Sequence, residues 1–288
     1  MLAIYKREFK SYFYSMTGSI FIGFLTFMTG IYFMAYNLHS GYPYFSYSLE
    51  GVMFVFLVAI PVLTMRSFSE ERRSRTDQLL LTSPVSVGKM VIGKYLAMVS
   101  VFLIPCVLFC AYPLIISTQG KAYFKADYAS ILVFFLLGCV YIAIGSFISA
   151  MTESQIIAAI GTFGVLMVVY LWDGLLGFLP SSAFGGMVGI WMILTLCVLF
   201  IYNMTKNGVL AGGLELIGTI ILVVLYFVKS SLYEGLLSTI FGKFALVSTF
   251  TSAAENSLLD IGGIVMYLTL IGVFLFLTVQ SIQKRRFS

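Results

Sequence analysis

The chain has 288 residues, of which 60% are hydrophobic and only 10% are charged, and its net charge is +5. Soluble globular proteins carry about 25% charged residues because their surfaces face water, so this composition excludes an ordinary soluble protein. Charge is costly in a bilayer, and the composition therefore indicates a membrane protein. The basic residues form short clusters between long apolar runs, which favours membrane orientation over nucleic-acid binding, so nucleic acid is not an expected partner.

Residues 1–14 predict an amphipathic helix that lies flat on the inner leaflet. Its apolar residues recur at helical spacing: Leu2, Tyr5, Phe9, Tyr12 and Phe13. Its basic residues take the other side: Lys6, Arg7 and Lys10. The alternative is a basic flank of the first membrane span. The apolar run that follows is not ended by a small-x-small cleavage site, so we expect a retained helix and not a signal peptide.

Eight apolar stretches are long enough to cross a bilayer core, which takes about 20 helical residues. They are residues 19–36, 49–65, 91–117, 129–150, 156–173, 187–204, 209–228 and 261–281. With a cytoplasmic N-terminus, four of the 17 lysines and arginines fall outside: Lys121, Lys125, Lys229 and Lys243. The positive-inside rule favours this orientation. The sequence thus predicts an all-α polytopic transmembrane bundle of one domain over residues 1–288, with both termini cytoplasmic.

Two of the segments predicted to lie outside the membrane, residues 37–48 and 229–260, have a distinctive composition. The first is rich in tyrosine and turn-forming residues, which is typical of an interfacial loop at headgroup level. The second is long and semi-apolar, and it predicts an extracellular amphipathic segment whose short helices lie on or dip into the outer leaflet.

The cytoplasmic loop at residues 66–94 is the most informative stretch. Its first half is dense in charges of both signs, including Glu70, Glu71, Arg72 and Arg73. Three leucines and a proline turn follow: Leu79, Leu80, Leu81 and Pro84. Glu71 precedes Arg75 by four residues, a stabilising order on a helix. A charged helix that ends in an apolar patch between two spans predicts a docking element; the alternative is a solvated loop that carries positive-inside charges.

Ionisable residues at membrane depth suggest function by default. Glu215 is the strongest case, because it lies a turn or two into the seventh span. It is expected to face a polar cavity or to pair with Lys206, or else to reach the interface and contact water. Glu153 lies in a short inner turn, where it caps the next helix or contacts a partner protein. The small residues Gly145 and Ser149 permit close helix packing.

The loop also resembles a known family. The resemblance rests on Met65-Arg66-x-Phe68-x-Glu70-Glu71-Arg72-Arg73-Ser74-x-Thr76, then Leu79-Leu80-Leu81-Thr82-x-Pro84-Val85-Ser86, then Gly93-Lys94. This run is similar to the signature of ABC-2 type permeases, and it is closest to the branch associated with gliding motility. The opening Tyr5-Lys6-Arg7-Glu8-Phe9-Lys10-Ser11-Tyr12-Phe13 resembles that branch too.

The resemblance implies a half-transporter that forms a homo- or heterodimer and binds two cytosolic ATPase subunits. Residues 1–14 would be its elbow helix, and the 66–94 loop would carry its coupling helix. The chain departs from the family pattern at Arg75, where glycine is usual, and at Asp77 and Gln78, where an apolar residue and glutamate are usual. Six spans are usual as well, so residues 187–204 and 209–228 look like an added hairpin.

Sequence motifs for catalysis are absent. No G-x-x-x-x-G-K-[ST] run occurs, so the chain has no phosphate-binding loop of its own. The single histidine, His39, has no nearby cysteine pair, and a metal site is therefore not expected. No hydrolase motif is present either. We expect no catalytic residue and no cofactor on this chain, with ATP and magnesium bound by the partner ATPase.

The combined prediction is a dimeric permease subunit in the inner membrane of a bacterium, surrounded by membrane lipid. ATP hydrolysis on a separate chain would drive export of an amphipathic or lipid-linked substrate. One alternative is an ion-coupled secondary transporter, which requires carboxylates near the bilayer midplane, and Glu215 is the main candidate. Others are a membrane-embedded enzyme that acts on lipid and a non-transporting membrane partner driven by an ATPase.

Overall fold

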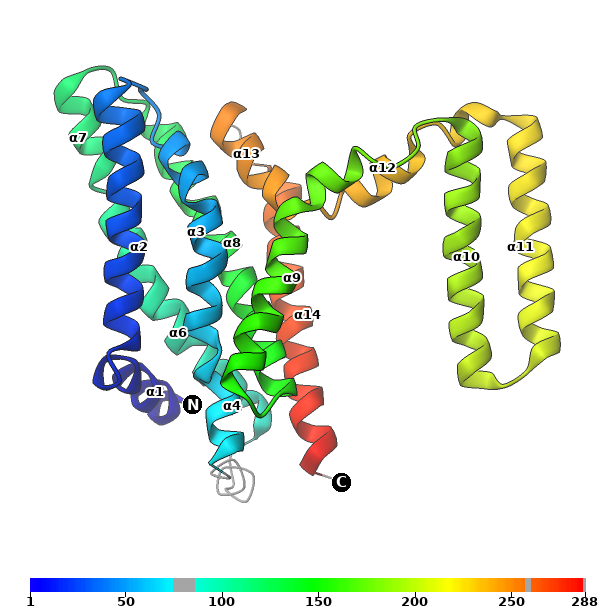
Figure 1. The fold of residues 1–288 in the computed structure, drawn as a ribbon, viewed down its shortest axis with the longest axis horizontal. Coiled ribbons are helices and arrows are strands. Elements are labelled where there is room, and N and C mark those ends of the chain that lie inside the picture. The colour runs from blue at the N-terminus through cyan, green and yellow to red at the C-terminus, as the bar shows by residue number, and fades with distance from the viewer. Residues whose placement is uncertain (75–85, 257–259, 287–288) are drawn as a thin grey trace. The chain divides into compact units, whose positions relative to one another are not determined.

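The computed structural model describes residues 1–74, 86–256 and 260–286, and every regular element among these residues is helical. Figure 1 shows the helices in chain order. They are α1 (Leu2–Tyr14), α2 (Thr17–Phe33), η1 (Met34–His39), α3 (Ser46–Thr64), α4 (Arg66–Arg73), α6 (Val87–Phe109), α7 (Tyr112–Gln119), α8 (Phe124–Met151), α9 (Gln155–Leu176), α10 (Ala183–Thr205), α11 (Gly208–Val228), η2 (Ser230–Leu232), α12 (Leu236–Gly242), α13 (Leu246–Asn256) and α14 (Ile261–Arg286).

The described residues contain eight helical segments that are long and apolar enough to cross a membrane. They are Thr17–His39, Ser46–Arg73, Val87–Gln119, Phe124–Met151, Gln155–Leu176, Ala183–Asn203, Gly208–Val228 and Ile261–Lys284. The prediction of an all-α protein with eight spans is confirmed. Helical structure follows from the solvent, because a chain that crosses hydrocarbon must satisfy its backbone hydrogen bonds internally.

The helices form two compact units, residues 1–170 with 246–288 and residues 171–245. In the first unit α8 is central and packs against α3, α4, α6, α13 and α14. Its core is aromatic, and Phe56 of α3, Phe102 of α6 and Phe134 of α8 are fully buried and in mutual ring contact. The predicted single domain remains a prediction, since a compact unit need not fold independently.

Small residues on α8 let neighbouring helices approach closely. A Cβ added at Gly145 would lie 2.4 Å from the Thr64 hydroxyl of α3, and one at Gly138 would lie 2.2 Å from the Phe102 ring. Gly145 and Ser149, whose spacing predicts a close helix contact, therefore pack within the first unit, as small residues do in membrane helices.

Part of the 229–260 segment belongs to the core of the first unit. This segment contains η2, α12 and α13, so the predicted short helices are present. In α13, Phe250 is fully buried and contacts the Phe134 ring, while the Tyr267 hydroxyl of α14 donates to the Leu246 carbonyl. The extracellular position of the segment remains a prediction.

The second unit is built around the antiparallel hairpin α10–α11. Only 6% of each of these two spans is buried, so both helices expose most of their apolar side chains. The Trp172 indole donates to the Phe241 carbonyl at 2.9 Å, and the Tyr233 hydroxyl donates to the Leu222 carbonyl at 3.0 Å. These bonds join α9 to α12 and the η2 segment to α11. The hairpin coincides with the pair predicted as an addition to six spans.

Candidate functional site

The charged helix α4 follows α3 after a one-residue break at Met65. Ser149 of α8 fills that break, because its Oγ accepts hydrogen bonds from the backbone N–H groups of Phe68 and Ser69, each at 3.2 Å. The same hydroxyl donates to the Met65 carbonyl at 3.1 Å. Ser149 is fully buried. One side chain therefore satisfies three backbone groups where the transmembrane helix passes into α4, as buried polar groups require.

Two arginine side chains of α4 bond to neighbouring elements of the bundle. Arg72 donates to the Ala150 carbonyl at 3.1 Å and pairs with Glu153 at 3.0 Å, so it reaches the end of α8 and the turn after it. Arg66 pairs with Glu70 at 2.8 Å within α4 and donates to the Thr17 hydroxyl at the start of α2 at 3.0 Å. Glu153 is largely exposed, so its pair with Arg72 contributes orientation more than stability.

A buried ammonium group joins α4 to α1 and α6. The Nζ of Lys94 donates to the Ser67 carbonyl at 2.7 Å and lies 2.9 Å from Glu71 and 3.5 Å from Glu8. Its side chain is only 2% exposed. Three acceptors thus surround a group that has three donors, and the Phe68 ring lies beneath it, 5.2 Å from Nζ to the ring centroid.

Arg7 completes this cluster at its solvent edge. Its guanidinium lies 2.7 Å from Glu8 and 3.1 Å from Glu71, so two cations and two carboxylates alternate. The hydrogen bond to Glu8 is the main reason that the pKa of Arg7 is raised. We call Arg7, Glu8, Glu71 and Lys94 the Lys94 charge cluster. It connects three helices that are separate in the sequence.

The helix α1 lies against α6 and α2. Its buried face carries Tyr12, whose hydroxyl donates to the Leu63 carbonyl at 3.2 Å, and Tyr5, whose hydroxyl donates to Ser100 at 3.0 Å. Phe9 packs against the core, and Phe13 is exposed. Burial raises the pKa of Tyr12, so this phenol remains a hydrogen-bond donor. Figure 1 shows α1 and α4 at the same end of the first unit, near both chain ends.

The structure thus brings together only some of the residues that the sequence singles out. Glu70, Glu71 and Arg72 make the contacts given above, and Arg73 is exposed at the end of α4. Leu79, Leu80, Leu81 and Pro84 lie outside the described residues, as does the predicted pair of Glu71 with Arg75. Sequence reasoning named Ser149 only as a small residue that permits close helix packing, and it selected neither Glu8 nor the pairing of Lys94. For Lys94, the available signal was a lysine eight residues into an apolar helix (α6).

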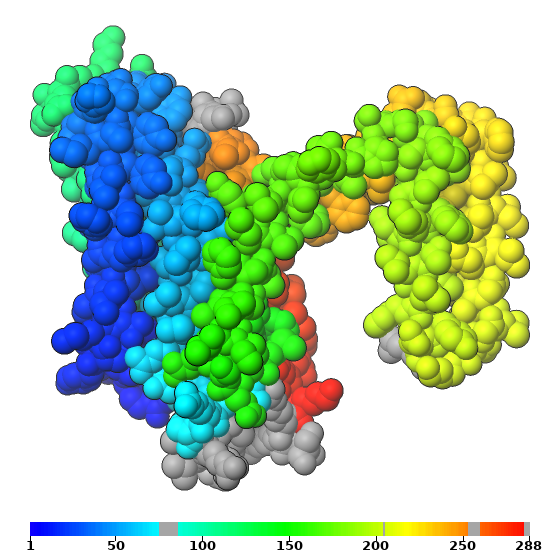
Figure 2. Space-filling view, in the orientation of Figure 1, coloured from blue at the N-terminus to red at the C-terminus, as the bar shows by residue number. Residues whose placement is uncertain are grey.

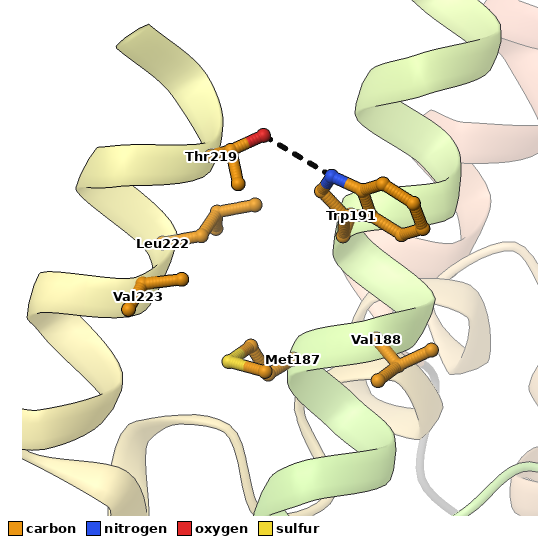
Figure 3. A pocket seen from close by; sticks show the side chains of 6 residues that line it. All are labelled: Met187, Val188, Trp191, Thr219, Leu222 and Val223. Carbon is orange, nitrogen blue, oxygen red and sulfur yellow. Dashed lines mark hydrogen bonds between the residues drawn. The ribbon is translucent and has the colours of Figure 1, made fainter. Parts of the chain in front are cut away.

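Glu215 bonds within the α10–α11 hairpin. Its Oε1 lies 2.8 Å from the Thr195 hydroxyl, and one turn away the Trp191 indole donates to the Thr219 hydroxyl at 3.1 Å. The predicted ion pair with Lys206 is not formed among the described residues. An apolar cavity of about 140 Å³ lies beside the hydrogen-bonded Trp191 and Thr219 (Figure 3). Its lining residues are Met187, Val188, Trp191, Thr219, Leu222 and Val223. The geometry is that of interhelical hydrogen bonding in a membrane.

These features define a polytopic helical membrane protein with a charged site that is held by several helices. The family comparison makes the class specific: the model of the ABC-2 family transporter proteins matches residues 34–188, slightly more than half of the chain. The chain belongs to this family and is a membrane permease of an ABC transporter. The match contains α4, Lys94 and Ser149 but does not distinguish branches of the family. No curated protein and no solved structure is significantly similar to the chain.

Proposed function

We propose that the chain is the membrane-spanning subunit of an ATP-driven exporter and that a separate cytosolic ATPase docks on α4 and the residues that follow it. The observation that supports this proposal is the attachment of α4. One short helix is bonded to α8 through Ser149 and Arg72, to α2 through Arg66, to α6 through Lys94, and to α1 through Arg7.

This attachment gives a docked ATPase a mechanical connection to the spans. A displacement of α4 cannot occur alone, because polar contacts to four other helices would have to move or break, and those to Ser149 and Lys94 are buried. Nucleotide binding on the partner would favour one packing of the spans, and hydrolysis would favour the other, which is the differential free energy that switching requires. The exposed Arg73 and the leucines at 79–81 are the contacts we assign to the ATPase.

The proposal also includes the orientation, the location and the assembly of the chain. Both termini and α4 face the cytoplasm of a bacterium, α1 lies on the inner leaflet, and two permease subunits form the transporter. The ATPase binds ATP and magnesium. The spans contain few charged residues, so we assign an amphipathic or lipid-linked cargo to the exporter.

The test is co-purification of the native complex in mild detergent. We expect a P-loop ATPase in stoichiometric amount, and we expect the triple change Leu79→Ser, Leu80→Ser and Leu81→Ser to remove it. A triple change at exposed apolar positions in the hairpin, Leu196→Ser, Leu199→Ser and Leu216→Ser, serves as the control and should retain the ATPase. If no ATPase accompanies the wild-type protein in detergents that preserve comparable complexes, the proposal is wrong.

Glu215 separates this proposal from ion-coupled transport. The Oε2 atom of Glu215 is buried and has no hydrogen-bond partner among the described residues, which is the observation that favours a proton site. We expect Glu215→Gln to change the ATPase rate of the reconstituted complex by less than about twofold, since the amide oxygen can still accept from Thr195 and such bonds contribute about 0.6 kcal/mol. The measurement is ATP hydrolysis in proteoliposomes with and without a protonophore. A rate that depends on the proton gradient and is lost in Glu215→Gln would support the secondary transporter instead.

A further inference from the structure

Six tyrosines form a continuous chain of contacting rings at the end of the first unit opposite α4. In order of contact they are Tyr32, Tyr36, Tyr42, Tyr47, Tyr44 and Tyr123. Successive ring centroids lie 6.1, 6.4, 5.0, 6.4 and 4.6 Å apart. They come from α2, η1, α3 and the two loops beside them. We call this group the outer tyrosine cluster.

The cluster lies at the surface. Tyr42 is 46% exposed, Tyr47 is 40% exposed and Tyr123 is 46% exposed. The ends of α2 and α3 beside the cluster are uncovered in the space-filling view of Figure 2. The layer beneath contains phenylalanine, with Phe33 and Phe45 buried and in ring contact. Phenol hydroxyls are thus concentrated on the exposed layer, where they can bond to a ligand.

Buried polar groups hold the loop that carries the cluster. The Asn37 side chain donates to the carbonyls of Tyr42 at 2.8 Å and Tyr44 at 2.9 Å, and it accepts from the Ser48 hydroxyl at 2.6 Å. The Asp127 carboxylate accepts from the backbone N–H of Phe45 at 2.8 Å.

Asn37, Ser48 and Asp127 are all at least nine-tenths buried. Asn37 lies in the π-helical turn η1, an element that is rare and frequent at functional sites. A headgroup anchor needs no such support, whereas a binding surface gains affinity when it is held in place before the ligand arrives.

We propose that the outer tyrosine cluster binds the saccharide part of the cargo as it leaves the permease. A pyranose ring has apolar C–H faces and hydroxyl groups around its edge, and the exposed tyrosines offer aromatic surface to the first and phenol hydroxyls to the second. Contacting rings give a surface along which successive sugars can bind, because stacking tolerates changes in position. This inference rests on the proposed function, since it names the class of cargo.

Charge and ring geometry disfavour two other ligands. Lys121 and Lys125 are exposed on either side of Tyr123, which disfavours a cationic ligand and accommodates acidic sugars. A proline-rich peptide docks in grooves that aromatic side chains line. Here Tyr44 and Tyr123 are stacked at 4.6 Å with an angle of 15° between their planes, so no groove remains between these two rings.

The test is binding of defined oligosaccharides to the purified full chain in nanodiscs of phosphatidylethanolamine and phosphatidylglycerol. The probes are cellohexaose, chitohexaose and maltohexaose, with a proline decapeptide for comparison, and the readout is saturation-transfer NMR. We expect at least one hexasaccharide to bind and the double change Tyr42→Ala and Tyr47→Ala to weaken it about tenfold or more. The double change Tyr42→Phe and Tyr47→Phe keeps the rings and should retain most of the affinity.

The control is Tyr14→Ala, which removes a tyrosine that is 85% exposed on α1, at the other end of the first unit. It should bind sugar like the wild-type chain. The proposal is overturned if none of the three hexasaccharides binds, if the double alanine variant binds equally well, or if only the proline peptide binds. Because no ATPase is present in this measurement, failure here leaves the proposed function intact, and loss of ATPase co-purification leaves this result intact.

Discussion

Replacing Lys94 with methionine is expected to destabilise the first unit by about 3–5 kcal/mol, because it leaves Glu8 and Glu71 without their buried cation. Methionine keeps the length and apolar stem of lysine but cannot donate to Ser67 or to either carboxylate. Arg7 also pairs with both carboxylates, but it is half exposed and cannot replace a buried cation. The connection of α4 to α1 and α6 would be lost with the ammonium group.

Two measurements report these losses separately. Thermal unfolding in detergent measures stability, and ATP hydrolysis by the reconstituted complex measures communication between the ATPase and the spans. We expect Lys94→Met to lower both the melting temperature and the dependence of hydrolysis on the permease. Adding Glu8→Gln should recover part of the stability, since one uncompensated carboxylate is removed, but should not recover communication.

The matched control is Lys89→Met, which changes an exposed lysine near the start of the same helix. It should melt and hydrolyse ATP like the wild-type complex, because exposed charges contribute little. Equal melting temperatures for the Lys94 and Lys89 variants would contradict the assignment of a buried charge cluster.

The helices were predictable because the bilayer imposes a length and a composition on each span. The ends of the helices were less predictable. The third predicted span covers 91–117, whereas the structure begins α6 at Val87 and continues through a break to Gln119 in α7. Hydropathy marks the part of a helix that lies in hydrocarbon, and a helix continues beyond it for as long as its backbone bonds and contacts allow.

The pairing of charges could not be derived from the sequence. The charge pattern of α4 identifies the helix, but its partners come from α1, α6 and α8, and no local spacing connects Glu71 with Glu8 or Lys94. The spacing rule instead assigns Glu71 to Arg75, a neighbour on the same helix. Long-range pairs depend on how the spans pack, which composition and periodicity do not specify. Lys94 entered the sequence reading only as the end of a loop and as the last residue of the family signature.

Ser149→Ala is expected to loosen the junction between α3 and α4, and the loss should be confined to that junction. The change leaves the N–H groups of Phe68 and Ser69 without their buried acceptor, and each such loss costs about 1–3 kcal/mol. We expect faster amide hydrogen exchange over residues 65–72, measured by mass spectrometry, together with weaker stimulation of the ATPase. The rest of α3 should exchange as before.

Ser146→Ala is the matched control because the two serines differ only in their partners. Ser146 is also fully buried on α8, but its hydroxyl donates to the Ile142 carbonyl of its own helix at 2.7 Å. Removing that bond leaves no backbone group of α4 unsatisfied, so exchange over 65–72 should not change. If both variants exchange alike, the junction is held by packing alone, and Ser149 does not position α4. If only Ser149→Ala is faster, the orientation of α4 depends on a hydroxyl group from α8, and the ATPase acts on a helix whose position the transmembrane bundle sets.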